Sequence, residues 1–306
     1  MIEIALVVSR WLQFAAAAIL CGAPAFFLYG VRQVSVPDDA WTKRLVLSAT
    51  LLGIVAAISM LLAQSAEMSG DAAAAFKADV VWAVLSDTYF GAVWAVRFLL
   101  LLAMGALVVA LPVGRARLMA FTAVGVLTAA SLAWMGHGRE GEGALGLAHL
   151  LADVLHVLAA SVWIGALVVL LRLLRRAAQG GSDEIRAAAY GLTRFSGIGS
   201  LVVATLLITG LVNAWALTAP HSISEALTTD YARLLLVKVA LFALMLALAA
   251  LNRFSLSPRL AAAADGPASG AAIGALRRTV LLETGLGLFV LLAVGALGVI
   301  EPPSAL

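Results

Sequence analysis

Three of the four histidines in this chain lie within twenty residues of one another, at His137, His149 and His156. Asp153 lies between the last two, inside a long apolar run. On a helix, these spacings put His149, Asp153 and His156 on one face, with His156 about 10 Å deeper than His149. Ionisable groups in an apolar segment usually point into a bundle interior, where they form an ion path, a proton relay or a cofactor site; a structural histidine is the alternative.

The residues around the first two histidines favour a metal site. His137 precedes a glycine-rich turn that brings it close to His149, and Met135 lies just before it. Met68 lies at the corresponding end of another apolar run, where a role as core filler is the alternative. Imidazole binds several transition metals and thioether sulfur favours Cu(I), so the mixture indicates a copper ion.

The two deeper residues have roles that the spacing leaves open. Two imidazoles seven residues apart bridge one ion only if both rings lean fully inward, so His156 is predicted to be a relay or a second site. Asp153 would either ligate directly or hold an imidazole in the required tautomer. The candidate metal-site residues are His137, His149, His156, Asp153, Met135 and Met68.

The composition predicts a membrane protein. Of 306 residues, 63% are hydrophobic and 12% are charged, whereas a soluble domain usually carries about 25% charged residues. Eight apolar runs have the length of roughly 20 residues that a helix needs to cross a bilayer. They predict an all-α integral membrane bundle in one domain, 1–306, with eight transmembrane helices near 4–30, 44–66, 91–111, 116–135, 147–171, 198–218, 231–251 and 279–299.

The basic residues predict the orientation of this bundle. Fourteen Lys and Arg fall in alternate connections, whereas four, with Arg97 counted among them, fall in the others. Connections rich in Lys and Arg stay in the cytoplasm, so both termini are expected to be periplasmic. The basic residues follow topology, so no nucleic acid partner is expected. The start of the chain carries Glu3 rather than a positive charge, which favours a retained first helix over a cleaved signal.

Several further polar positions have two interpretations each. Residues 71–90 are too polar to cross a membrane and too apolar for a free loop, which favours an interfacial helix. Lys238 and Glu283 lie inside apolar runs, where they could pair or serve proton coupling; direct pairing is doubtful because they fall at different depths. Cys21 has no partner for an internal disulfide.

A weak internal repeat relates two apolar runs. Superposing 13–22 on 156–165 sets Gln13 over His156 and Gly22 over Gly165. Both runs are predicted to cross the membrane in the same direction, so a parallel repeat of two four-helix halves is a hypothesis.

Motifs in order along the chain resemble the copper resistance D (CopD) family of bacterial inner-membrane proteins. The resemblance rests on "GHGREGEGALGLAHLLADVLHVLAASVWIGAL", "TRFSGIGS", "ITGLVNAWAL", "LTTDYARLLLVKVALFALMLALAALNRFSLSPRL" and "LETGLGLFVLLAVGALGVIEPP". It implies the eight-helix fold in the inner membrane, a role in moving copper, and a separate periplasmic partner of the CopC type. Gln13 and Asp153 stand where some relatives carry histidine, which leaves the ligand set open.

Two other function classes remain beside a copper permease. One is a copper-binding sensor or scaffold that does not transport, and the other is a haem-binding or quinone-linked electron carrier, since buried histidines also ligate haem. The sequence contains no P-loop and no aspartyl-phosphate signature, so no enzyme activity is expected.

Overall fold

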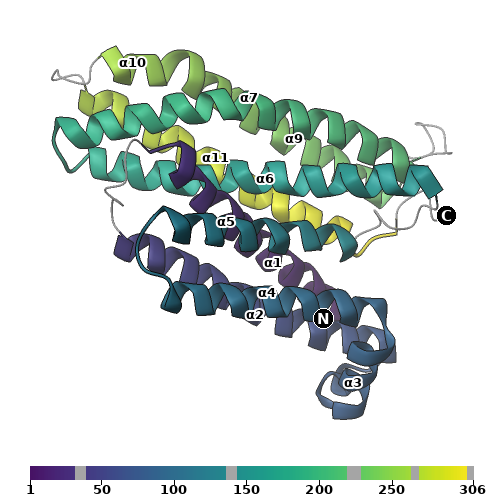
Figure 1. Cartoon of the computed structure of the whole chain (residues 1–306). Coiled ribbons are helices and arrows are strands. Elements are labelled where there is room, and N and C mark those ends of the chain that lie inside the picture. The colour runs from purple at the N-terminus through teal and green to yellow at the C-terminus, as the bar shows by residue number, and fades with distance from the viewer. Residues whose placement is uncertain (32–38, 136–142, 219–228, 263–268, 302–306) are drawn as a thin grey trace.

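The computed structural model describes residues 1–31, 39–135, 143–218, 229–262 and 269–301, which fold into a helical bundle (Figure 1). Within this described part, eight helices are long and apolar enough to cross a membrane. They are α1 (Ile2–Tyr29), α2 (Asp39–Ser69), α4 (Tyr89–Ala110), α5 (Arg115–Ala130), α6 (Gly143–Ala177), α7 (Ser182–Thr218), α9 (Asp230–Leu251) and α11 (Ser269–Leu297). The predicted all-α bundle of eight transmembrane helices is confirmed.

Shorter helices extend or connect these spans. η2 (Ser131–Met135) continues α5, and the π-helix η4 (Asn252–Leu256) and α10 (Ser257–Ala262) continue α9. Residues 71–90, expected to form one interfacial helix, instead form η1 (Ala72–Phe76) and α3 (Ala78–Asp87), because the backbone is extended at Lys77. These two pack against the ends of α2 and α4.

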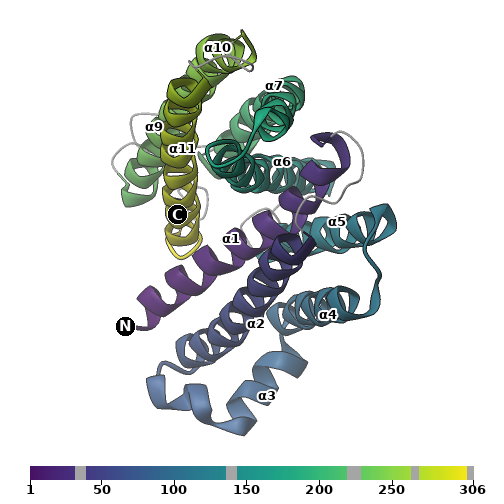
Figure 2. The same ribbon diagram turned by 90° about the vertical axis from the view of Figure 1, so that its left-hand side faces the viewer.

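The eight spanning helices form two groups of four. α1 belongs to the first group and lies where the two groups meet. Figures 1 and 2 show α2, α4 and α5 on one side of α1, and α6, α7, α9 and α11 on the other. α1 crosses α6 at two glycines: a Cβ on Gly22 would lie 2.9 Å from the Cα of Gly165. The two helices therefore approach as closely as their backbones allow.

Equivalent positions in the two groups support the repeat suggested by the sequence. Gly22 and Gly165, superposed in that alignment, contact each other, as expected for residues on a pseudo-twofold axis between α1 and α6. α4 and α9 begin alike, because Thr88 and Thr229 each accept a hydrogen bond at the N-cap. Counting from these caps sets Arg97 over Lys238.

α5 and α11, the last helices of the two groups, pack against α1 and α6 in a similar way. Gly125 of α5 packs against Leu20 and Cys21 of α1, and Gly287 of α11 packs against Met245 of α9 and Ile164 of α6. Cys21 and Ile164 are equivalent in the α1–α6 alignment. The match makes Phe121 of α5 the counterpart of Glu283 of α11.

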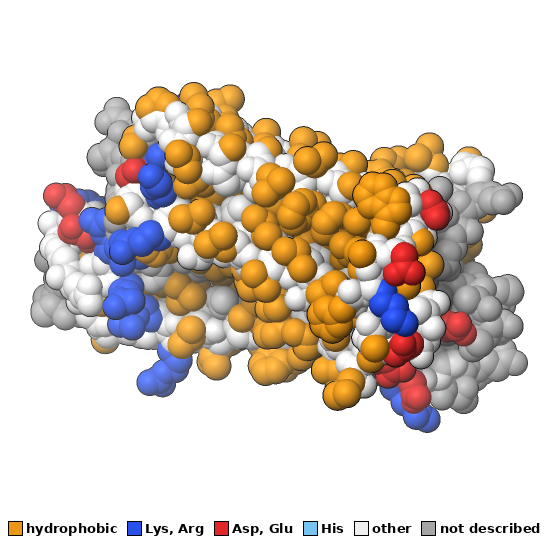
Figure 3. Space-filling model, turned by 90° about the horizontal axis from the view of Figure 1, so that it is seen from below, with side chains coloured by type: hydrophobic (Ala, Val, Ile, Leu, Met, Phe, Trp, Pro, Cys, Tyr) orange, Lys and Arg blue, Asp and Glu red, His pale blue; other side chains and the backbone are white. Residues whose placement is uncertain are grey.

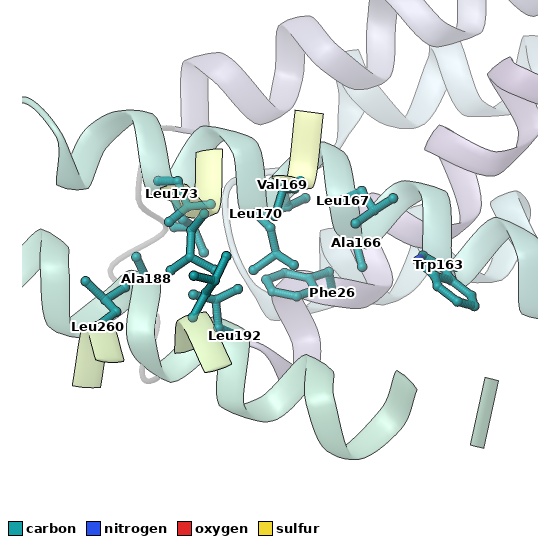
Figure 4. Packing of buried hydrophobic residues seen from close by; sticks show 14 of the residues in the cluster. Phe26, Trp163, Ala166, Leu167, Val169, Leu170, Leu173, Ala188, Leu192 and Leu260 are labelled. Atoms are coloured by element: carbon teal, nitrogen blue, oxygen red, sulfur yellow. The ribbon is translucent and has the colours of Figure 1, made fainter. Parts of the chain in front are cut away.

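The surface and the interior are both largely apolar. Figure 3 shows an apolar band across the middle, with most of the visible basic side chains at one end, some acidic ones beside them, and a mixture of acidic and basic side chains at the other end. The basic end carries Lys43, Arg44, Arg115, Arg176, Arg253, Arg277 and Arg278, and the acidic end carries Glu67, Asp71, Asp79, Asp87 and Asp230. Inside, Phe26 of α1 packs among leucines of α6 and α7, with Trp163 farther along α6 (Figure 4).

Candidate functional site

A cavity of about 170 Å³ with several polar side chains in its wall, here the outer cavity, lies toward the acidic end of the molecule. Helices α1, α6, α7, α9 and α11 enclose it. His149, Asp153 and His156 of α6 all line it, as expected for residues that share one helix face. The other polar or charged side chains in its wall are Arg10, Ser161, Asn213, Tyr231 and Lys238.

His156 is held in a defined orientation by α7. Its Nδ1 lies 2.9 Å from Thr209 Oγ1, and this hydroxyl lies 2.6 Å from Thr205 O. A hydroxyl has one hydrogen, which Thr209 donates to the carbonyl, so it accepts from the imidazole. His156 therefore carries its hydrogen on Nδ1, which leaves the Nε2 lone pair available to a ligand.

Asp153 is already engaged by neighbouring side chains. Asn213 Nδ2 of α7 donates to Asp153 Oδ1 at 3.2 Å, and Lys238 of α9 lies within electrostatic range of the carboxylate. The carboxylate thus accepts a hydrogen bond and lies near a cation, and both its ligand role and its orienting role stay predictions. Asn213 Oδ1 is buried and has no hydrogen-bond partner in the described part of the chain. The cavity therefore offers an acceptor oxygen beside the carboxylate.

The two cations of the outer cavity have compensating neighbours. Lys238 lies near Asp153, and the guanidinium of Arg10 packs against Gly298, just past the end of α11. The C-terminus of a helix carries partial negative charge, which stabilises a cation. The positive charges in the wall are thus partly offset, and the two imidazoles add ring nitrogens to the same wall.

Of the other three predicted ligands, the structure describes the side chain of Met68 alone. His137 lies outside the described residues, as does the side chain of Met135. Met68 lies at the end of α2, 57% exposed, and is not part of the cavity wall. Among the described residues, no three His, Cys, Asp or Glu side chains gather closely enough to hold a metal ion. The six-residue ligand set therefore stays a prediction.

Arg97 is a buried cation that the sequence pattern did not predict. Arg97 was counted among connection residues, but it lies within α4 and is 2% exposed. It donates from Nη1 to Gln13 Oε1 at 2.6 Å, from Nε to Ser131 Oγ at 2.9 Å and from Nη2 to Ser131 O at 2.8 Å. A charge inside the apolar run 91–111 was the signal that identifies it.

A second buried network lies toward the basic end, around Glu283 of α11. Trp163 Nε1 donates to Glu283 Oε1 at 2.6 Å, and Asn252 Nδ2 donates to Glu283 Oε2 at 2.9 Å. The hydroxyl of Thr279 donates to Asn252 Oδ1. Lys238 faces the outer cavity instead, so Glu283 and Lys238 do not pair, as their different depths suggested.

The fold and site define a multi-pass α-helical membrane protein with a histidine-lined cavity toward one face. Two family models match the chain: "Copper resistance protein D-like, N-terminal domain" over residues 1–147 and "Copper resistance protein D" over residues 189–297. The chain belongs to the copper resistance protein D family, and is a copper-related membrane protein.

Three curated relatives extend this comparison. Copper resistance protein D of Pseudomonas syringae pv. tomato is 31% identical, with 92% of each chain covered. Inner membrane protein YebZ of Escherichia coli K12 is 29% identical over 85% of this chain and 84% of the relative. Copper transport protein CutJ of Bacillus subtilis 168 is 26% identical over 79% of this chain and 45% of that protein.

Proposed function

We propose that this protein carries copper ions across the bacterial inner membrane, entering through the outer cavity. The observation that carries the proposal is the common cavity of His149, Asp153 and His156 in a chain of this family. The names of two relatives, a copper resistance protein and a copper transport protein, support it. The activity is transport and not the conversion of a substrate, so the protein is not an enzyme.

The direction of entry follows from charge. Basic loops stay in the cytoplasm, so the basic end faces inward, the acidic end faces the periplasm, and α1 begins and α11 ends on the periplasmic side. The name of the relative YebZ supports the inner membrane as the location. A separate periplasmic copper-binding protein of the CopC type would then deliver the ion to the acidic end.

Within the cavity, each side chain has a distinct proposed role. His149 receives the ion at the entrance, with His137 as a further ligand. His156 accepts it next through Nε2, because Thr209 fixes its tautomer. Asp153 balances the charge of the arriving cation and of Lys238. Met68 and Met135 remain candidate ligands at the mouth.

The test is copper uptake into proteoliposomes that contain the purified protein. We expect His149→Ala and His156→Ala to lower uptake by about tenfold or more, the usual effect of losing a metal-site group. Leu151→Ala is the matched control, because Leu151 is an exposed residue of α6 between the two histidines and should leave uptake unchanged. Equal uptake by the wild type and both histidine variants contradicts this route.

The same preparation separates the other function classes. Copper that binds to the protein but never enters the vesicles identifies a sensor or scaffold. A Soret absorption band in the purified protein identifies a haem carrier.

A further inference from the structure

Two more cavities continue from the outer cavity toward the basic end. The middle cavity, of about 250 Å³, shares His156 and Lys238 with the outer cavity. The inner cavity, of about 330 Å³, shares Trp163 with the middle cavity. Both cavities lie between α7 and α9, which make few contacts with each other, and residues of α6 and α11 also line them. Trp163, 2% exposed, therefore stands between the histidine end and the basic end of this series.

The side chain that holds Trp163 in place is a carboxylate. Glu283 lines the inner cavity, is 1% exposed, and accepts hydrogen bonds from Trp163 and Asn252. Both donors are neutral, and no cation pairs with Glu283 in the described residues. A carboxylate buried at membrane depth with neutral partners only is costly and is a hallmark of proton or ion pathways.

The other half of the molecule shows that the fold does not need this polar group. The counterparts of Trp163 and Glu283 are Leu20 and Phe121, both buried in one apolar cluster formed by α1, α2, α4 and α5. The counterpart of Asn252 is Leu111, also apolar. Packing at these positions is therefore satisfied by apolar side chains in one half, and the polar trio is particular to the half that contains the cavities.

The donor set around Glu283 suits a proton better than Cu(I). It contains a carboxylate, an amide, an indole and a hydroxyl, without thioether, thiolate or imidazole, whereas Cu(I) prefers soft ligands. Among the residues that line the inner cavity, the titratable or charged ones are Glu283 and Arg253. Arg253 donates to Ser196 O and to the hydroxyl of Ser200.

The remaining charged groups on the surrounding helices lie elsewhere. α7 presents serines to the inner cavity, and Lys238 of α9 and His156 of α6 lie beyond Trp163, in the outer and middle cavities. Arg10 of α1 lines the outer cavity and does not line the inner cavity. The charged groups nearer the basic end that do not line the inner cavity are Arg172, Arg175, Arg176, Asp183, Glu184, Arg186, Arg194, Arg259, Arg277 and Arg278. Glu283 is thus the group that can take a proton from the inner cavity.

We infer that Glu283 is the proton-binding group of this carrier, and that its protonation releases Trp163 to connect the middle and inner cavities. This inference rests on the proposed transport function. A hydronium ion in the inner cavity gives its proton to the carboxylate, an O–H bond forms, and a water molecule remains. The neutral acid is a weaker acceptor than the carboxylate, so the hydrogen bond from Trp163 Nε1 weakens and the indole is free to move. Loss of the proton restores the bond and closes the path.

The test compares Glu283→Gln with Glu67→Gln, a matched change at an exposed glutamate of the acidic end. Copper uptake is measured in proteoliposomes over a series of pH values, equal inside and outside. For the wild type and Glu67→Gln, we expect uptake to rise as pH falls, by up to about tenfold per pH unit, the slope of one titrating proton. For Glu283→Gln, whose amide imitates the neutral acid, we expect fast uptake with no such slope. A wild-type slope in Glu283→Gln overturns the inference.

A second measurement does not depend on transport. The infrared difference spectrum between acidic and alkaline pH should contain a carbonyl band of a protonated carboxylic acid in the wild type, Glu67→Gln and Trp163→Phe. Glu283→Gln should lack that band. If the wild type takes up no copper but the band assigns to Glu283, transport is wrong and Glu283 still binds a proton. If the wild type transports copper and Glu283→Gln retains the band, the inference is wrong and transport stands.

Discussion

At the scale of single residues, the two halves use equivalent buried cations differently. Arg97 is fixed by Gln13 and Ser131, whereas its counterpart Lys238 faces the outer cavity beside His156. Gln13 is in turn the counterpart of His156 in the α1–α6 alignment. In the first half, Arg97 and Gln13 are hydrogen-bonded to each other, whereas in the second half Lys238 and His156 line a cavity.

The hydrogen bond between Thr209 and His156 leads to the first prediction. Thr209→Val keeps the shape of the side chain but removes the acceptor that holds Nδ1–H, so the imidazole loses its fixed tautomer. We expect copper to bind about 10–100-fold more weakly, as for other groups that orient a metal-binding histidine. Equilibrium dialysis measures this affinity. Thr205→Val is the control, because its hydroxyl donates to Leu201 O on the same helix and Thr205 does not line the outer cavity. Unchanged affinity in Thr209→Val contradicts a ligand role for His156.

The Arg97 network leads to a prediction about stability. Arg97→Met retains most of the packing volume but leaves Gln13 Oε1 and Ser131 without their buried donor. Each hydrogen bond to a charged group contributes about 1.5–3 kcal/mol, so we expect a loss of at least about 2 kcal/mol in the free energy of unfolding. Denaturation in detergent micelles, followed by circular dichroism, measures it. The exposed Arg115 provides the control Arg115→Met, which should change stability little.

At the scale of elements, the apolar runs were enough to predict all eight spans but not their ends. α7 begins at Ser182 rather than near 198, because its first turns carry Asp183, Glu184 and Arg186. A hydropathy pattern detects the part of a helix that lies in lipid, and polar turns beyond the lipid go unnoticed. The predicted interfacial segment was divided for a local reason, the extended backbone at Lys77.

The candidate site was predictable only along one helix. The spacing of His149, Asp153 and His156 placed them on one face, because the helical period is a local property. The partners Thr209 and Asn213 come from α7, more than fifty residues away, and their contacts depend on how α6 and α7 pack. Sequence spacing carries no information on that packing.

The crossing of α1 and α6 leads to a prediction at this scale. Gly165→Ala places a methyl group against the backbone of Gly22, and backbone atoms have little freedom to move aside. We expect a loss of about 1–3 kcal/mol or more in the free energy of unfolding, as for other overpacked interfaces. The midpoint of thermal unfolding reports it. Gly274→Ala is the control, because a Cβ there meets nothing within 4 Å.

At the scale of the whole molecule, the two halves differ in how far they are closed. α2 packs against α4 in the first half, whereas their counterparts α7 and α9 hardly touch in the second. The space left between α7 and α9 contains the middle and inner cavities. His149, His156 and Glu283 all line cavities of the second half, which is the half that our proposed function uses as the path.

The direction of this path depends on orientation, which can be tested with single cysteines. The chain has one cysteine, Cys21, which is buried, so labelling by a maleimide would come from an introduced cysteine. Asp87 lies at the acidic end and Gln179 at the basic end, and both are exposed, so each can be replaced by cysteine. Because basic loops stay in the cytoplasm, a membrane-impermeant maleimide added to spheroplasts should label Asp87→Cys, and should label Gln179→Cys only after the membrane is permeabilised. The reverse pattern would place the outer cavity in the cytoplasm, so copper entering at His149 would leave the cell, and Glu283 would take its proton from the periplasm.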